Sequence, residues 1–247
     1  PKLYGSCSYL PPVDAPGAAP FDPADLIASG ITQVQRPPLS LTGQGVILCF
    51  IDTGIDTKPV FLDENGNSRI LAIWDQTVQT GIPPEGFKYG SEYRREDINL
   101  ALRSEDPYSI VPPGTKTDTA VSSPESPPAV SSDKAILNRA APGADIVVVE
   151  AQGMKQYLRS FYLVPEGVPA YQENDIMLGI KYAESFVRLF ERPVVICLGL
   201  GTNQGDHAGN SSCHGIFLPR CPQKPCRHRL RGKWRERLTP LPWKTKR

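Results

Sequence analysis

The segment at residues 45–56 constrains the fold more than any other part of the sequence. Six apolar residues in a row, 46–51, lead directly into Asp52, Thr53 and Gly54. A short, unbroken, β-rich run predicts a strand of a parallel sheet that is covered on both faces. Asp52 would then end the strand, where open α/β sheets place ligands and catalytic groups. The competing interpretation is a core strand whose Asp only caps the next turn.

Further patterns predict more of an α/β fold. Residues 145–150 are typical of a second buried strand, and residues 68–74 of an extended segment. Residues 173–190 predict a long helix, after which 194–198 return as a strand; together they form the βαβ unit of a parallel sheet. The expected apolar stripe of this helix is Ile176, Ile180, Ala183 and Val187.

Two shorter helices are also predicted. One covers residues 22–34, with Asp22 as its cap and Pro23 at the first helical position. The other covers residues 94–103 and presents Ile98 and Leu102 on one face.

The segment around Asp52 resembles the aspartate segment of the subtilisin-like serine proteases, the subtilases. Other segments resemble the germination-protease-like branch found in spore-forming Firmicutes: 28–31, 41–43, 68–76, 83–87, 105–112 and 198–205. The resemblance covers roughly residues 22–112 and 140–210. It implies a subtilisin-like three-layer α/β fold with a mostly parallel sheet, incomplete in this chain.

Subtilases use an Asp-His-Ser triad in that chain order, and the resemblance makes Asp52 its carboxylate. The histidine is expected in a Gly-His-Gly-Thr-like segment and the serine in a Gly-Thr-Ser-like segment. Neither segment is present, and the chain's three histidines, His207, His214 and His228, lie in other contexts. The chain as written is therefore expected to be inactive. Two other acids, Asp56 and Asp75, are expected only to cap turns.

Residues 113–139 stand where the histidine segment belongs, but they are rich in Pro and Ser. A linker is one interpretation. In another, this stretch is out of frame, because shifting residues 114–129 by one base allows Asp-Glu-Asn-Gly-His-Gly-Ser-Leu-Ile-Thr-Gly-Val-Ala-Ala-Gly-Ser. The same interpretation applies to the tail at 211–247. The expected organisation is a disordered or pro-like segment at 1–21, a partial catalytic domain at 22–210 and an aberrant basic tail at 211–247.

Gly199, Leu200 and Gly201 follow the strand at 194–198. In subtilases the matching edge pairs with the substrate backbone, so the resemblance implies a protein or peptide substrate bound by strand addition. A Gly-rich turn after a strand is the alternative, and both interpretations stay open.

The charge distribution is uneven. Residues 220–247 contain 11 of the 27 Lys and Arg residues and one acid, Glu236, which leaves 16 basic and 25 acidic residues elsewhere. A nucleic-acid-binding arm is the obvious hypothesis. The tail has no recognisable binding motif and its composition fits a shifted frame, so we expect no nucleic-acid partner.

The cysteines and histidines predict no metal site and no cofactor. The tail places Cys213, Cys221, Cys226, His214 and His228 near one another, but without paired zinc-ligand spacings. Cys49 and Cys197 lie in apolar strands and are predicted to be buried, reduced thiols.

No apolar run is long enough for a membrane span and no signal peptide is visible, so neither a membrane partner nor a location is assigned. Pro1 and the family's usual length suggest an amino-terminal fragment. The oligomeric state is not predicted. The leading function is a serine endopeptidase by family; the alternative is a non-catalytic relative, a pseudoprotease with a binding or regulatory role.

Overall fold

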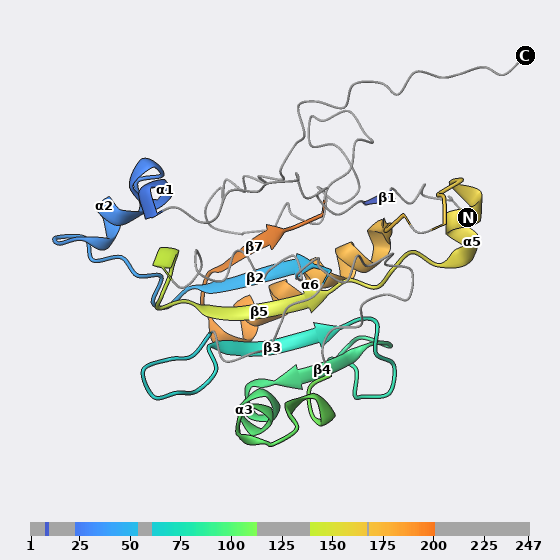
Figure 1. Cartoon of the computed structure of the whole chain (residues 1–247), viewed down its shortest axis with the longest axis horizontal. Helices are drawn as coiled ribbons and strands as arrows, with labels where there is room; N and C mark the ends of the chain where they lie inside the picture. The colour runs from blue at the N-terminus through green and yellow to red at the C-terminus, as the bar shows by residue number, and fades with distance from the viewer. Residues whose placement is uncertain (1–7, 10–22, 54–60, 113–138, 167, 201–247) are drawn as a thin grey trace, which may run out of the picture.

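The computed structural model describes residues 8–9, 23–53, 61–112, 139–166 and 168–200. Within these residues, the centre is a five-stranded sheet of order β4-β3-β5-β2-β7 (Figure 1). The strands are β2 (Ile47–Asp52), β3 (Ile70–Asp75), β4 (Ser91–Arg94), β5 (Asp145–Glu150) and β7 (Val194–Leu198). All are parallel except β4, which is antiparallel to β3. This mixed, mostly parallel arrangement confirms the predicted α/β fold class.

β5 is the middle strand of the sheet, between β2 and β3. Its four central residues are at most 1% exposed, a setting that suits its β-branched side chains. β2 differs: Ile47, Cys49 and Ile51 are completely buried, whereas Leu48 and Phe50 are only half-buried. The face that carries Leu48 and Phe50 is therefore covered only in part, with Phe50 packed against the core on that side.

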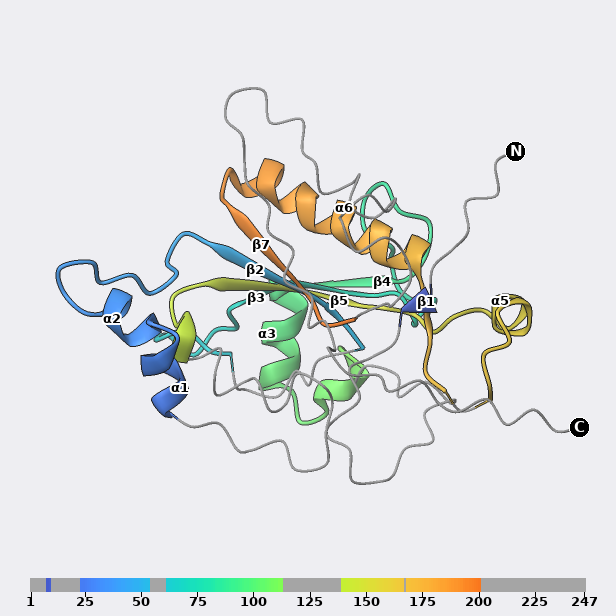
Figure 2. The ribbon, with the colours of Figure 1, turned by 90° about the horizontal axis from the view of Figure 1, so that it is seen from above.

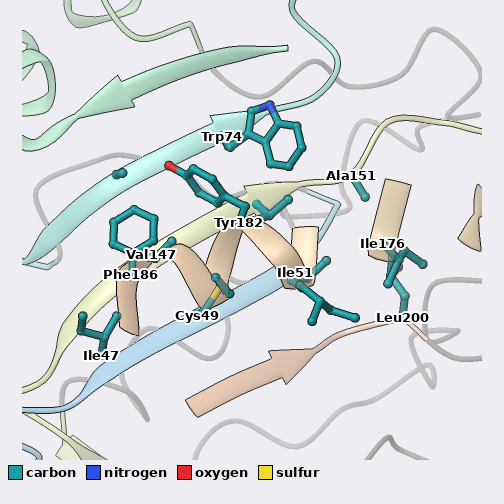
Figure 3. Close-up of a cluster of buried hydrophobic side chains, with 14 of the residues drawn as sticks. Ile47, Cys49, Ile51, Trp74, Val147, Ala151, Ile176, Tyr182, Phe186 and Leu200 are labelled. Atoms are coloured by element: carbon teal, nitrogen blue, oxygen red, sulfur yellow. The ribbon is translucent and has the colours of Figure 1, made fainter. Parts of the chain in front are cut away.

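The two faces of the sheet have different covers (Figure 2). On the α6 face lies the long helix α6 (Glu173–Phe190), and on the α3 face the shorter α3 (Arg95–Arg103). Figure 3 shows the cluster of the α6 face, which includes Ile47, Cys49, Ile51, Trp74, Val147, Ala151, Ile176, Tyr182, Phe186 and Leu200. The smaller cluster of the α3 face comprises Phe61, Ile70, Ile73, Ile98, Ala101, Val111, Ile146 and Val148.

Helix α6 has the predicted bounds. Ile176, Ile180 and Ala183 are buried as expected. Val187 is 42% exposed, and Phe186 takes its place with its ring centroid 5.1 Å from that of Tyr182. The buried stripe therefore continues from Ala183 by three residues instead of four, which the 3.6-residue helical repeat allows equally well.

The amino-terminal helical region is split. Instead of one helix it forms α1 (Pro23–Ala28) and α2 (Ile31–Gln35). Gly30 between them has a left-handed φ of 80°, a conformation that ends helices. The start at Pro23 is confirmed, whereas the Asp22 cap lies outside the described residues.

Several short elements lack a strong sequence pattern and were not predicted. They are β4, the 3-10 turn η1 (Pro107–Ser109), helix α5 (Gln156–Phe161) and an antiparallel pair formed by β1 (Ser8–Tyr9) and β6 (Tyr171–Gln172). By contrast, α3 begins within one residue of its predicted start, and it buries Ile98 and partly buries Leu102.

β7 is an edge strand within the described residues, and this position corrects one prediction. Val194, Ile196 and Leu198 pack against the α6 face. The alternate residues point the other way, where none of the described residues covers them, so Val195 is 53% exposed and Cys197 is exposed. Cys197 is therefore not a buried thiol, whereas the burial of Cys49 is confirmed.

Asp145, at the amino end of β5, connects the sheet to the helices on both of its faces. Its carboxylate pairs with Arg95 of α3 and with Arg192, which follows α6 and places Nη1 2.6 Å from Oδ2. Arg192 also donates hydrogen bonds to the carbonyls of Gly45 and Val46, at 3.1 and 3.2 Å. One carboxylate thus holds helices from opposite faces to the same edge of the sheet.

Candidate active site

Three acids end three neighbouring strands. Asp52 of β2 is the register partner of Glu150 of β5, and Glu150 is the partner of Asp75 of β3. The carboxyl ends of β2, β5 and β3 lie along one edge of the sheet, called the carboxyl edge below (Figure 1). Side chains alternate along a strand. Two positions before the acids, Ile73 and Val148 belong to the α3-face cluster and Phe50 packs against it. By the alternation of side chains, all three carboxyl groups project from the α3 face at this edge.

Asp52 is half-buried, and both of its carboxylate oxygens have defined surroundings. The backbone N–H of Thr53 donates to Oδ1 at 2.7 Å. Oδ2 lies against the Cα of Gly199, so closely that a Cβ at that position would overlap it. The main chain fixes this approach, because Ala151 N–H donates to the Asp52 carbonyl at 2.8 Å and Gly199 N–H to the Ile51 carbonyl at 3.0 Å. The strand pairing therefore brings Asp52 and Gly199 together.

Of the predicted substrate-binding residues, the structure describes Gly199 and Leu200, while Gly201 lies outside the described residues. The Leu200 side chain is 2% exposed and packs into the α6-face cluster. Because that side chain is buried, Leu200 can offer a peptide only its backbone.

Glu150 occupies the middle of the row of acids. Its side chain is 3% exposed, and Oε1 has no hydrogen-bond partner among the described residues. Burial, followed by the adjacent Asp75 carboxylate, raises the pKa of Glu150 to about 9. A buried carboxyl group without a compensating cation keeps its proton, because the charged form would lose its hydration. Glu150 is therefore a neutral acid at neutral pH.

Asp75 is 2% exposed but has donors of its own. Its Oδ1 accepts hydrogen bonds from the backbone N–H and the hydroxyl of Thr77, at 2.7 and 2.6 Å. The Val78 N–H adds a third, at 3.2 Å. Asp75 thus caps the turn after β3, which confirms the sequence prediction for this residue.

Sequence reasoning missed Tyr171 of β6. Its side chain is 4% exposed, and its pKa is raised to about 12 by burial, followed by the charges of Asp52 and Glu150. β6 therefore lies beside the carboxyl edge, where its pairing with β1 places two residues of the amino-terminal region.

A second polar group that sequence reasoning missed lies on the α6 face around Asp175. The Tyr89 hydroxyl donates to its Oδ1 at 2.8 Å, and Gln76 Nε2 donates to its carbonyl at 3.0 Å. Gln76 also reaches the strand ends, because its N–H donates to the Glu150 carbonyl at 3.0 Å. The available signal was a run of polar residues, 172–175, at the start of an apolar helix.

The remaining candidates are not described. Asp56, His207, His214 and His228 lie outside the described residues, as does all of 113–139 except Arg139. Within the part of the chain that is described, no group of three His, Cys, Asp or Glu residues could hold a metal ion. No helix in that part is both long and apolar enough to cross a bilayer.

Comparison with known proteins places this geometry in context. No family model and no curated protein matches the chain. Among solved structures, the Clostridium perfringens CspB protease is similar, with a TM-score of 0.56 and 27% sequence identity. The match covers 79% of this chain and 36% of that chain. The fold thus matches part of a subtilisin-like protease, and the chain resembles a serine protease in structure.

Proposed function

We propose that this chain carries the aspartate part of the catalytic centre of a subtilisin-like serine endopeptidase. The placement of Asp52 carries the proposal. Asp52 ends a central parallel strand in a sheet that matches part of a protease. Thr53 N–H holds one of its oxygens, and the other lies against Gly199. This is the fixed carboxylate that the chemistry requires.

In such an enzyme a serine hydroxyl attacks the peptide carbonyl while an imidazole accepts the hydroxyl proton. A carboxylate orients the imidazole and stabilises its charged form. Asp52 would have this third role. A hydrogen bond from a backbone N–H favours the charged form of a carboxylate, so the contact with Thr53 supports it.

The substrate class that fits this site is a protein or peptide. Residues 199–201 would pair with the substrate backbone, with Gly199 and Gly201 keeping the edge open and Leu200 anchoring it through its buried side chain. No cofactor is needed for this reaction.

The chain as translated should not cleave peptides, because no histidine stands in a triad context. We propose that residues 113–139 and 211–247 are out of frame and that the correct frame restores the histidine segment. Sequencing the encoding DNA across codons 105–140, 205–247 and beyond tests this directly. A small insertion or deletion at each site supports the proposal, and unchanged bases contradict it.

Labelling with a serine-directed fluorophosphonate tests the activity. The chain as translated should show no labelling, whereas a frame-corrected product that includes a serine segment should be labelled. In that product Asp52→Asn should lower the peptidase rate by about 10⁴-fold, the loss seen when a triad aspartate is removed. Unchanged activity in D52N would exclude Asp52 from the reaction.

The alternative is a pseudoprotease that binds peptides without cleaving them. It is favoured by one observation, the well-packed carboxyl edge in a chain without a triad histidine. Unaltered DNA together with measurable peptide binding by calorimetry would select it.

A further inference from the structure

Gly199 occupies a position where a side chain would displace the Asp52 carboxylate. A Cβ on Gly199 would lie 2.5 Å from the Asp52 Cγ and would overlap Oδ2, although Cβ contacts closer than 3.0 Å essentially never occur. The strands cannot easily move apart, because β2 and β7 pair in register from Ile47–Val194 to Ile51–Leu198.

The backbone at this position does not itself require glycine. The left-handed glycines of the described residues are Gly30, Gly43, Gly45, Gly66, Gly86 and Gly90, and Gly199 is not among them. An L-residue could adopt the local backbone without strain. The neighbouring carboxylate is therefore the reason that a side chain does not fit.

We propose that Gly199 is a positioning residue for Asp52. Its bare Cα forms a notch that receives Oδ2, while Thr53 N–H binds Oδ1. The notch and the N–H together select one side-chain rotamer and aim the carboxylate. The catalytic meaning of this aim rests on the proposed function, whereas the notch is a property of the folded chain.

The peptide-binding role of Gly199 makes a different prediction. If the glycine served only to keep the edge open for a peptide, a methyl group would obstruct the peptide and leave Asp52 unchanged. The positioning role predicts instead that the methyl group acts on Asp52 in the absence of any peptide.

A double-mutant cycle in urea unfolding of the full chain tests the contact. Gly199→Ala should lower the urea midpoint in the wild-type background. In the Asp52→Ala background the obstruction is gone, so adding G199A should change the midpoint little. Equal losses in both backgrounds, or a double variant that fails to fold while D52A folds, would overturn the proposal.

The amide proton of Thr53 provides a readout that a general loss of stability does not move. In the wild type its NMR shift should follow the titration of Asp52, and in D52N that response should be absent. In folded G199A the response should be largely lost, because the carboxylate turns away. A full response in G199A would refute the notch. Failure of fluorophosphonate labelling would leave both readouts unchanged, so the two proposals can fail separately.

Discussion

The two faces of the sheet surround their buried acids differently. Asp175 on the α6 face is 4% exposed, and burial raises its pKa, but the Tyr89 hydroxyl, Gln152 and Gln172 oppose this rise. Glu150 on the α3 face is 3% exposed, and among the described residues no donor reaches its Oε1. Its pKa is raised to about 9. One oxygen of each acid, Oε1 of Glu150 and Oδ2 of Asp175, has no hydrogen-bond partner among the described residues. The two environments differ in the donors to Asp175, in the nearby Lys155, which also opposes the rise of its pKa, and in the Asp75 carboxylate, which adds to the rise for Glu150.

Thiol chemistry should show the largest contrast between the faces. Cys49 is buried under α6, and burial raises the pKa of its thiol, whereas Cys197 on the α3 side of β7 is exposed. An alkylating reagent should modify Cys197 faster by on the order of a thousandfold, because Cys49 reacts only after opening of the core. Peptide mapping by mass spectrometry measures both rates. Comparable rates would mean that the α6 face is not closed.

The pH dependence of stability tests the state of Glu150. The ordinary pKa of its carboxyl is 4.5 and the folded chain raises it to about 9, so between these values the folded state keeps a proton that the unfolded chain releases. The free energy of unfolding from this group is greatest below 4.5. It falls by up to about 1.4 kcal/mol per pH unit and levels off above the folded pKa.

Glu150→Gln should flatten this part of the pH profile, because the amide has no proton to lose. Urea unfolding of both proteins between about pH 5 and about pH 10 makes the comparison. The same slope in E150Q as in the wild type would show that another group is responsible.

Tyr89→Phe tests the hydrogen bond to Asp175 Oδ1. Removing the hydroxyl leaves Asp175 Oδ1 without its 2.8 Å donor, and an unsatisfied buried acceptor costs about 1–3 kcal/mol. The matched control is Tyr108→Phe at a residue that is 43% exposed, which should change the free energy of unfolding by less than about 0.5 kcal/mol. Equal losses in the free energy of unfolding for Y89F and Y108F would mean that the Tyr89 hydroxyl does not stabilise the fold through Asp175.

Asp75→Asn should give the smallest change. The asparagine keeps an acceptor for Thr77 and Val78 but removes the charge beside Glu150. Burial is the larger cause of the raised pKa, so the upper end of the pH-dependent window should move down by about one unit or less. A window that does not move would mean that burial alone sets it.

The sequence predicts the parts of the fold that have strong periodicity. β5 and β7 are continuous apolar runs and α6 is a long amphipathic segment, so their bounds follow from pattern alone. β4 has only four residues, so its formation depends on tertiary contacts. The break between α1 and α2 depends on the backbone dihedral angle of Gly30, which interrupts an otherwise helical stretch. The exposure of Cys197 depends on which strand lies at the edge, which no local pattern encodes.

The same distinction applies to the candidate site, where some residues follow from local pattern and others depend on the fold. The sequence makes Asp52 and Gly199 candidates because each follows an apolar strand segment directly. The row formed by Asp52, Glu150 and Asp75 depends on the register of three strands. Asp175 and Tyr89 are 86 positions apart in the chain, and only folding brings them into contact.

The two ion pairs of Asp145, with Arg95 and Arg192, lie at the amino end of β5, whereas Asp52 lies at the carboxyl edge. The ion pairs that hold the helices to the sheet are therefore separate from the proposed catalytic site. Substitutions at the carboxyl edge leave the ion pairs of Asp145 with Arg95 and Arg192 in place, so the fold can persist when residues of the proposed site change.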